Sequence, residues 1–320
     1  MNTHPAAAAS TLAELGEFAL IAAVAGVAPT AEQVLVGPGD DAAQIRTTTG
    51  SVLMSTDLLI EGRHFRRDWS SAADVGHKAA AANLADIAAM GGTATALTVG
   101  FAAPPDLDPG WAIEMSAGLA EEAALVGAAV VGGDVTAADQ VMIAVALIGE
   151  SLAAPVLRSG ARAGDVVAAI GRIGWAAAGY HVLARGFRSP RVIVSAHRRP
   201  DPPYAAGPAA AAAGATAMVD VSDGLLADLG HVADASGVAI DVRAAAFEIA
   251  EPLQAVGAAL GVDPLSFILT GGDDHTLVAT FGPDAELPAG FTVIGQVADG
   301  SGVTIDGTTY EGETGHAHFR

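Results

Sequence analysis

Hydrophobic and polar positions in the first half of the chain follow either a helical or a strand-like spacing. Short runs of branched aliphatic residues predict strands, whereas alanine-rich stretches predict helices. Thr11 and Glu14 have the spacing of a capping box, which places a helix start there. The predicted helices are Thr11 to Val27, Asp74 to Met90 and Asp108 to Val126, and the predicted strands are Ser51 to Leu59, Ala96 to Phe101, Ala128 to Val131 and Val141 to Gly149.

Periodicity is lost between Ser151 and Gly164, so we place a domain junction there. This gives an N-terminal α/β domain over 1–150 and a C-terminal α/β domain over 151–320. The basic, proline-rich stretch Arg188 to Gly207 is expected to be irregular, as a solvated linker or as a loop beside a nucleotide. The other predicted elements are strands at Val166 to Ile170, Ala217 to Val221 and Val238 to Val242, and helices at Trp175 to Arg185 and Leu225 to Ala235.

The chain is strongly acidic, with 36 acidic residues against 15 basic ones and a formal charge of −21. Such a charge repels nucleic acid phosphates and anionic membrane surfaces, so we expect neither as a partner. An acidic protein that handles an anionic substrate needs cations between the two, and Mg²⁺ with carboxylate ligands meets that need. For most of these carboxylates, solubility is the simpler role.

The chain contains no cysteine, which excludes disulfides, thiolate metal sites and a cysteine nucleophile. Its first ten residues lack the lysine or arginine of a secretory signal. Uncharged runs are interrupted by Gly, Thr and Pro, unlike a membrane span. We therefore expect a cytoplasmic protein.

Aspartates recur beside glycines or after apolar strands, where a sheet presents side chains at its edge. The segment Gly37 to Asp41 is the first such cluster, although Gly-Asp pairs are also ordinary turn residues. Ser55-Thr56-Asp57 is expected at a strand end and offers oxygen ligands suited to Mg²⁺, or a helix cap. Asp86, a poor residue for a helix interior, is expected to face a specific group or to pair with Lys78.

Two further clusters follow buried-looking strands. Gly132-Gly133-Asp134 is expected just after a strand, where glycines let a phosphate approach backbone N–H groups. In Ala217 to Gly224, a strand ends near Asp220 and a helix begins near Gly224. A helix N-terminus attracts anions, so carboxylates around it make sense if metal ions lie between them and a phosphate. N-capping by Ser222 or Asp223 is the alternative.

Several common nucleotide and metal sites are absent from the sequence. There is no Gly-x-x-x-x-Gly-Lys-Ser/Thr loop, no Gly-x-Gly-x-x-Gly between a strand and a helix, and no protein-kinase signature set. The nine histidines lack the spacing of zinc enzymes. Bound ATP would therefore need a different kind of site.

Read in order, the clusters resemble the thiamine-monophosphate kinase family, which belongs to a superfamily that includes aminoimidazole ribonucleotide synthetase. The resemblance extends nearly from end to end. It rests on Glu17 to Ile21, Gly39 to Asp41, Ser55 to Asp57, Glu61 to Phe65, Lys78 with Asn83 to Gly91, Gly132 to Asp134, Arg158 to Ala161 with Gly164-Asp165, and Asp220 to Leu225.

This resemblance implies a two-domain α/β fold like that of aminoimidazole ribonucleotide synthetase, with the N-terminal domains of a homodimer forming a shared β-barrel and the C-terminal domain closing the cleft. It implies ATP as donor, thiamine monophosphate as acceptor and several Mg²⁺ ions, without a general base, because a phosphate is already a nucleophile. The implied metal ligands are Asp41, Ser55, Thr56, Asp57, Asp86, Asp134, Asp220 and Asp223. The implied ATP contacts are Gly133, Asp134, Arg158 and Ser222, and the implied substrate contacts are His64 and Asp273.

The sequence departs from this family on the substrate side. Where the family usually has Gly-Gly-Glu-Asp-Tyr-Glu, this chain has Asp273 and His275 within Gly271 to Thr276. An aromatic expected near the carboxyl end is also missing, with Glu313, His316 and Phe319 in that region. Selenophosphate synthetase and hydrogenase-maturation dehydratase require a cysteine, and aminoimidazole ribonucleotide synthetase itself fits the motifs less well. A non-enzymatic nucleotide or metal sensor is the alternative from another class.

Overall fold

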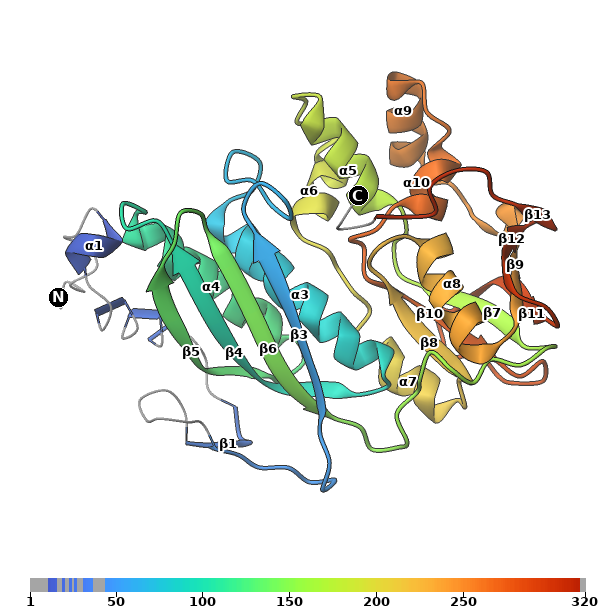
Figure 1. The fold of residues 1–320 in the computed structure, drawn as a ribbon, viewed down its shortest axis with the longest axis horizontal. Helices are drawn as coiled ribbons and strands as arrows, with labels where there is room; N and C mark the ends of the chain where they lie inside the picture. The colour runs from blue at the N-terminus through green and yellow to red at the C-terminus, as the bar shows by residue number, and fades with distance from the viewer. Residues whose placement is uncertain are drawn as a thin grey trace. The chain divides into compact units, whose positions relative to one another are not determined.

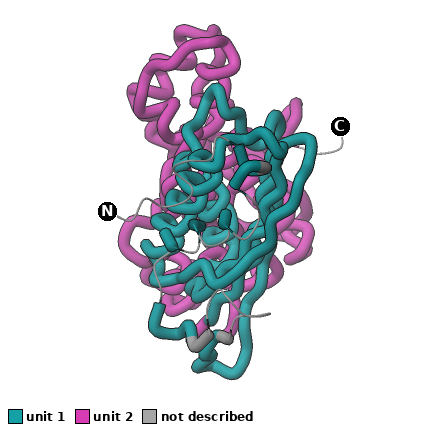
Figure 2. Tube along the Cα trace, turned by 90° about the vertical axis from the view of Figure 1, so that its left-hand side faces the viewer, with its two compact units in different colours: residues 1–87, 93–150 teal, residues 88–92, 151–320 magenta. Residues whose placement is uncertain are grey.

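The computed structural model describes residues 11–15, 19–20, 23–24, 26–27, 31–36 and 44–316. Tertiary contacts divide the chain into two compact units, shown in two colours in Figure 2. The first unit contains residues 1–87 and 93–150, and the second contains residues 88–92 and 151–320.

The first unit is built on a four-stranded sheet with the order β3-β6-β4-β5, in which only the β4–β5 pair is parallel (Figure 1). A two-stranded ribbon, β1-β2, accompanies it. The elements are α1 (Leu12–Leu15), β1 (Val34–Val36), β2 (Gln44–Ile45), β3 (Leu53–Ile60), α3 (Ala72–Ala89), β4 (Thr93–Ala103), α4 (Pro109–Ala124), β5 (Ala129–Ala137) and β6 (Met142–Glu150).

Helices α3 and α4 lie on one face of this sheet (Figure 1). Their own backbones approach closely, because a Cβ atom on Gly76 would lie 1.9 Å from the carbonyl oxygen of Met115. The sheet side chains below them are sealed, with Ile143 and Val145 of β6 both 0% exposed. Small residues thus bring α3 and α4 close together, and polar side chains of α3 reach β3.

The opposite face of the sheet is more open. Side chains alternate between the two faces of a strand, and directly paired residues of β3 and β6 share a face. Ser55 and Asp57 therefore share the helix-covered face, whereas Met54 and Leu58 point the other way and are 73% and 43% exposed. Large apolar side chains are therefore exposed on this outer face.

The second unit contains a seven-stranded sheet with the order β13-β12-β9-β11-β7-β10-β8. Its pairs are antiparallel except for β12 with β9. The elements are β7 (Val166–Ile170), α5 (Trp175–Ala184), α6 (Arg191–Arg198), α7 (Ala206–Ala212), β8 (Ala217–Val221), α8 (Leu225–Ser236), β9 (Ala239–Val242), a 3-10 turn (Ala244–Ala246), α9 (Glu251–Leu260), α10 (Pro264–Thr270), β10 (Thr276–Phe281), β11 (Thr292–Ala298), β12 (Gly302–Ile305) and β13 (Thr308–Thr309).

Two apolar clusters cover the faces of this sheet. Leu225, Leu229 and Val232 of α8 pack against one face, together with Val219 and Val278. On the other face, Ala210 of α7 packs with Met218 and Phe281. The strands β8 and β10 are thereby buried on both sides, in agreement with their mainly apolar sequences.

The stretch Arg188 to Gly207 is not irregular as predicted, because it contains α6 and the start of α7. Apolar positions on one side of α6 allow the helix to bury Ile193, Val194 and Ala196, while Arg191 at its start is exposed. Gly179 of α5 makes this packing possible, since a Cβ atom there would lie 2.5 Å from the carbonyl oxygen of Ile193.

Two other expectations require correction or completion. β5 extends to Ala137, well beyond its predicted end at Val131, because its parallel pairing with β4 continues that far. Of the predicted Thr11 to Val27 helix, the structure describes Leu12–Leu15 and short pieces after it, and the Thr11 hydroxyl accepts the Glu14 N–H as a capping box requires.

Among the described residues, no single helix is long and apolar enough to cross a membrane. Helices α9 and α10 are long and apolar enough only when they are taken together, and the chain bends by 108° between them.

We expect Gly179→Ala to destabilise the protein by about 1–3 kcal/mol, because the added methyl group forces α5 and α6 apart. Gly230→Ala is the matched control, since Gly230 also lies in a helix of the second unit but has no atom within 4 Å of an added Cβ. That control should be neutral or stabilising by up to about 1 kcal/mol. Thermal unfolding followed by circular dichroism measures both, and equal effects would contradict the packing argument.

Candidate functional site

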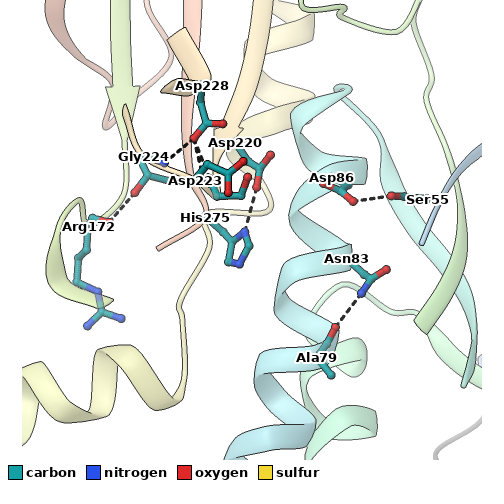
Figure 3. A network of polar contacts seen from close by, with 12 residues as sticks. Ser55, Ala79, Asn83, Asp86, Arg172, Asp220, Asp223, Gly224, Asp228 and His275 are labelled. Carbon is teal, nitrogen blue, oxygen red and sulfur yellow. Dashed lines mark hydrogen bonds and ion pairs between the residues drawn. The ribbon is translucent and has the colours of Figure 1, made fainter. Parts of the chain in front are cut away.

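The first group of polar side chains links β3 to α3. Ser55 donates its hydroxyl to the Asp86 carboxylate at 2.5 Å (Figure 3). One turn earlier in α3, the Asn83 side chain accepts the Asp57 backbone N–H at 3.1 Å and donates to the Ala79 carbonyl at 3.0 Å. Asp86 and Asn83 are three residues apart, so both point from one face of the helix to the same strand. The expectation that Asp86 faces a specific group is confirmed by its contact with Ser55.

Ser55, Thr56 and Asp57 were predicted at a strand end, but they lie in the middle of β3. The strand continues to Ile60 because it pairs with β6 along its whole length. Strand alternation then separates the three side chains. Thr56 is on the outer face and donates its hydroxyl to the Val145 carbonyl at 2.9 Å, whereas Ser55 and Asp57 are on the face of α3.

Gly132-Gly133-Asp134 also lies inside a strand, β5, and not after one. Gly133 has a packing reason to be glycine, since a Cβ atom there would lie 2.1 Å from the carbonyl oxygen of Val99 in β4. The side chain of the next residue, Asp134, is exposed. The glycine and the acid thus arise from different requirements, one of strand pairing and one at the surface.

His64 follows β3 in a turn, and its ring is held by the backbone. Its Nδ1 atom accepts the Ile60 N–H at 3.0 Å. In the neutral ring, a nitrogen that accepts leaves the proton on the other nitrogen, so His64 carries its proton on Nε2. It can therefore donate a hydrogen bond from Nε2, which suits a phosphate contact better than a role as a base.

In the second unit, the end of β8 and the start of α8 form a tight acidic turn. Asp228 Oδ2 accepts the N–H groups of Ser222, Asp223 and Gly224 at 3.0–3.1 Å (Figure 3). The residue before the helix is Gly224, and no side chain caps it. The proposed N-capping by Ser222 or Asp223 is therefore wrong, because Asp228 from inside the helix binds those N–H groups instead. Ser222 and Asp223 contribute their backbone N–H groups to this contact, and not their side chains.

Burial raises the pKa of Asp228 to about 7, and the negative charges of Asp220 and Asp223 add to that effect. The N–H groups of Gly224 and Asp223 act in the opposite direction, because they stabilise the carboxylate. Asp220 itself is only 3% exposed. The turn thus concentrates negative charge where water is scarce, which favours the arrival of a cation.

The loop from Gly271 to Thr276 folds over this turn. The N–H of Asp273 donates to the Ser222 carbonyl at 2.9 Å, and the N–H of His275 donates to the Val221 carbonyl at 3.0 Å. Gly272 permits the crossing, since a Cβ atom there would lie 2.0 Å from the Ser222 carbonyl oxygen. Asp273, expected on the substrate side, is thereby held next to the acidic turn.

Asp274 anchors the same loop from its other side. Its carboxylate accepts the N–H groups of Gly174 and Ala176, at 2.6 and 2.9 Å, and so binds the first turn of α5. Burial raises the pKa of Asp274 to about 7, while these two N–H groups act to lower it. The adjacent His275 turns toward β8 and places its Nδ1 atom 3.0 Å from Asp220 Oδ2.

Two other chain segments reach the start and the end of α8. Near its end, the Ser236 hydroxyl donates to the Arg158 carbonyl and accepts the N–H of Gly160, while the Arg158 side chain is exposed. Near its start, the N–H of His316 donates to the Asp223 carbonyl at 2.9 Å. The carboxyl-terminal segment therefore runs beside the acidic turn.

The structure thus assembles two oxygen-rich groups, one in each unit. Ser55, Asp57 and Asp86 form the first, and Asp220, Ser222, Asp223 and Asp273 form the second, while Thr56 and Asp134 point elsewhere in the first unit. Asp41 lies outside the described residues. Within the described part of the chain, no three His, Asp or Glu side chains form a complete metal centre. Mg²⁺ commonly takes only one or two carboxylates, with waters and substrate phosphates as its other ligands, so the donors present fit that ion.

Asp228 and Asp274 were missed by the sequence reasoning. Both carboxylates bind backbone N–H groups around the acidic turn, and neither was predicted as a metal ligand. An acid in the first turn of a predicted helix was the available signal for Asp228. For Asp274 there was no local signal, because its partners Gly174 and Ala176 are about a hundred residues away.

The chain was compared with known proteins. The N-terminal domain of AIR synthase related protein matches residues 39–151, and the C-terminal domain of AIR synthase related protein matches residues 162–307. A thiamine-monophosphate kinase of Mycobacterium tuberculosis is 48% identical over 97% of this chain and 93% of its own. One of Corynebacterium glutamicum is 39% identical over 90% of this chain and 87% of its own. A solved structure of AaThiL complexed with AMPPCP and TMP is 31% identical, with a TM-score of 0.78, over 95% of this chain and 98% of that one.

We expect Asp228→Asn to change how stability depends on pH in the presence of a chelator. The amide oxygen can accept the same three N–H groups, but the charge is gone. In the wild type, Asp228 has a pKa of about 7 in the folded protein and near 3.8 in the unfolded chain. Between these two pH values, the folded protein keeps a proton that the unfolded chain has released. Stability therefore falls as pH rises from about 4 to about 7, and Asp228→Asn should lack this loss. Its melting temperature relative to the wild type should be higher at about pH 8 than at about pH 5.

Asp228→Ala is the control for the hydrogen bonds. It leaves three N–H groups without their acceptor and should lose about 2 kcal/mol or more at every pH. The raised pKa of Asp274 makes the stability of the wild type and of both variants depend on pH in the same way, so it does not affect the comparison. Parallel melting curves for the wild type and Asp228→Asn across the pH range would contradict the argument.

Proposed function

Because the chain belongs to the thiamine-monophosphate kinase family, within the AIR synthase related proteins, we propose that it transfers the γ-phosphoryl group of ATP to thiamine monophosphate. The products are thiamine diphosphate and ADP. The observation that carries the proposal is the 48% identity over 97% of the chain with a thiamine-monophosphate kinase. A relative of the same fold, AaThiL, has been solved complexed with AMPPCP and TMP. A reaction that uses ATP fits a cytoplasmic location, which we propose as well.

The proposed reaction needs no general base. A terminal phosphate oxygen of the acceptor is already ionised near neutral pH and forms a bond to the γ-phosphorus, while the bond from that phosphorus to the leaving ADP oxygen breaks. His64, whose neutral ring carries its proton on Nε2, is suited to donating a hydrogen bond to the acceptor phosphate. Asp273 is the acid we propose on the side of the thiamine ring, where a carboxylate attracts a cationic ring. Gly133, Asp134, Arg158 and Ser222 remain the proposed ATP contacts.

Magnesium is the proposed metal, and hard oxygen donors support it. We propose that several Mg²⁺ ions bind. Ser55, Asp57 and Asp86 are the proposed ligands from the first unit, and Asp220 and Asp223 are those from the second. Asp41 is a further proposed ligand. Thr56 and Asp134 were predicted as ligands too, but their side chains point away from Ser55, Asp57 and Asp86, so we do not include them in this set. When bound, Mg²⁺ neutralises the repulsion between two anionic phosphates and stabilises the charge that moves onto ADP. The protein's own contribution is to keep these oxygens fixed, through Asn83 beside β3 and Asp228 beside β8.

Purified protein with ATP and Mg²⁺ should convert thiamine monophosphate to the diphosphate, with one ADP released per product. Thiamine itself should react far more slowly, because its hydroxyl group needs a base that the site does not supply. A chelator should stop the reaction, and added Mg²⁺ should restore it. Asp220→Asn should lower kcat by about a hundredfold or more, whereas Asp139→Asn, an exposed turn residue, should not.

Product analysis by chromatography together with ADP release provides the measurement. Faster turnover of thiamine than of its monophosphate would overturn the proposed reaction. Full activity in the chelator would overturn the proposed metal.

We also propose that the protein is a homodimer whose interface includes the outer face of the four-stranded sheet. Met54, Leu58, Ala144 and Ala146 share that face, because directly paired residues of β3 and β6 point the same way. The two large side chains are 73% and 43% exposed, and an apolar sheet face of this kind is normally covered by a partner. A second copy supplies a matching face through a two-fold axis.

Light scattering coupled to size-exclusion chromatography should show a dimer for the wild type and a monomer for Met54→Glu, since a carboxylate on this face would be buried without a partner. Leu152→Glu is the matched control, because Leu152 is 97% exposed but lies in the loop after β6. It should remain dimeric. A dimeric Met54→Glu, or a monomeric wild type, would show that this face is not the interface.

A further inference from the structure

The loop from Gly271 to Thr276 contains unusual backbone conformations for side-chain-bearing residues. Asp273 and His275 have φ angles of 72° and 53°, in the left-handed region that glycine favours. In the described part of the chain, Asp306 is the other non-glycine residue with a positive φ. Such conformations persist when surrounding contacts hold them, and they concentrate at functional sites.

The surrounding contacts of this loop come from three elements. Asp274 binds the N-terminus of α5, the N–H groups of Asp273 and His275 bind the end of β8, and the Thr276 hydroxyl donates to the Arg172 carbonyl at 2.5 Å. These bonds fix the backbone on both sides of His275. The strained conformation then determines where the imidazole ring points.

The ring points at the Asp220 carboxylate, with 3.0 Å between His275 Nδ1 and Asp220 Oδ2 (Figure 3). Both residues are buried, at 5% and 3% exposure. An ionised carboxylate only accepts hydrogen bonds, so Nδ1 must carry a proton to make this contact. One oxygen of Asp220 is thereby committed to His275, and Figure 3 shows the other pointing away from the ring.

We propose that His275 is a positioning residue for metal binding, which holds Asp220 Oδ2 so that Oδ1 remains for the cation. The inference rests on the proposed function, which assigns Asp220 to Mg²⁺. Second-sphere hydrogen bonds to a ligating carboxylate fix its rotamer, and their loss typically lowers metal affinity by about ten- to a hundredfold. His275 differs from a ligand in that it never touches the metal.

A purely structural role for His275 predicts something different. If the ring only satisfies a buried acid, its loss lowers the melting temperature but leaves metal affinity unchanged once the variant is folded. Metal affinity measured without turnover separates the two roles. We choose Mn²⁺ as the probe, because it takes the same oxygen ligands as Mg²⁺ and its unbound form is counted by electron paramagnetic resonance.

Three substitutions at one position make the test specific. Asn places a donor nitrogen the same number of bonds from the backbone as His Nδ1, and it tolerates the left-handed conformation. Gln carries the same amide one bond further out, and Ala has no donor. We expect Mn²⁺ affinity in His275→Asn to stay within about threefold of the wild type and to fall by about tenfold or more in His275→Gln and His275→Ala. Excess Mg²⁺ should displace the bound Mn²⁺.

Two controls complete the experiment. Asp306→Ala, at the other strained position, measures the effect of replacing a left-handed residue and should leave Mn²⁺ affinity unchanged. Asp220→Asn should weaken Mn²⁺ binding at least as much as His275→Ala. If His275→Ala does not fold, the Asn and Gln variants still decide the question, because equal affinities in these two would overturn the proposal.

The outcomes also separate this inference from the proposed function. If Asp220→Asn weakens Mn²⁺ binding while His275→Gln and His275→Ala bind like the wild type, the positioning role is wrong and the assignment of Asp220 stands. If Asp220→Asn binds Mn²⁺ like the wild type, the metal assignment of Asp220 is wrong and the inference falls with it.

Discussion

Carboxylates at the end of β8 repel one another, and the second unit is organised around that repulsion. Asp220, Asp223 and Asp228 come from a single strand–turn–helix segment, and burial denies Asp220 and Asp228 the screening of water. Asp228 is balanced by three N–H groups at the start of α8, and Asp220 by the ring of His275. Asp223 contributes its backbone N–H group to the contact with Asp228. A cation is the natural complement to this arrangement, which is why a metal-dependent function fits the geometry.

In the first unit, contacts between a helix and a strand hold the oxygen-bearing side chains in place. Small residues let the two helices of this unit pack closely together. Gly76 brings α3 and α4 together, and the Ser55–Asp86 and Asn83–Asp57 contacts then join α3 to β3. Rigid elements hold the oxygens here, whereas a strained loop holds them in the second unit. Fixed donors of both kinds favour ion binding, because little order has to be created when the ion arrives.

Several local features were visible in the sequence, and others were misjudged for physical reasons. The ranges of β7 and β8 agree with their predictions, since both strands are mainly apolar, as buried strands are. Ser55 to Asp57 and Gly132 to Asp134 looked like strand ends because aspartate and glycine are poor strand formers. Pairing with β6 and β4 overrode that preference. The helix α6 was missed because prolines at both sides resembled a linker, although its apolar positions were correctly spaced for a helix.

The sequence alone determined, through the order of its short motifs, which family the chain belongs to, and it predicted a set of oxygen-bearing site residues. Motifs of a few residues are local, and neither their chemistry nor their order depends on how the chain folds. Tertiary structure alone decided which of these residues share a face, that Asp228 binds the N–H groups just ahead of α8, and that His275 turns to Asp220. Those outcomes depend on contacts between segments far apart in the chain, such as Asp274 with α5, and no local pattern encodes them.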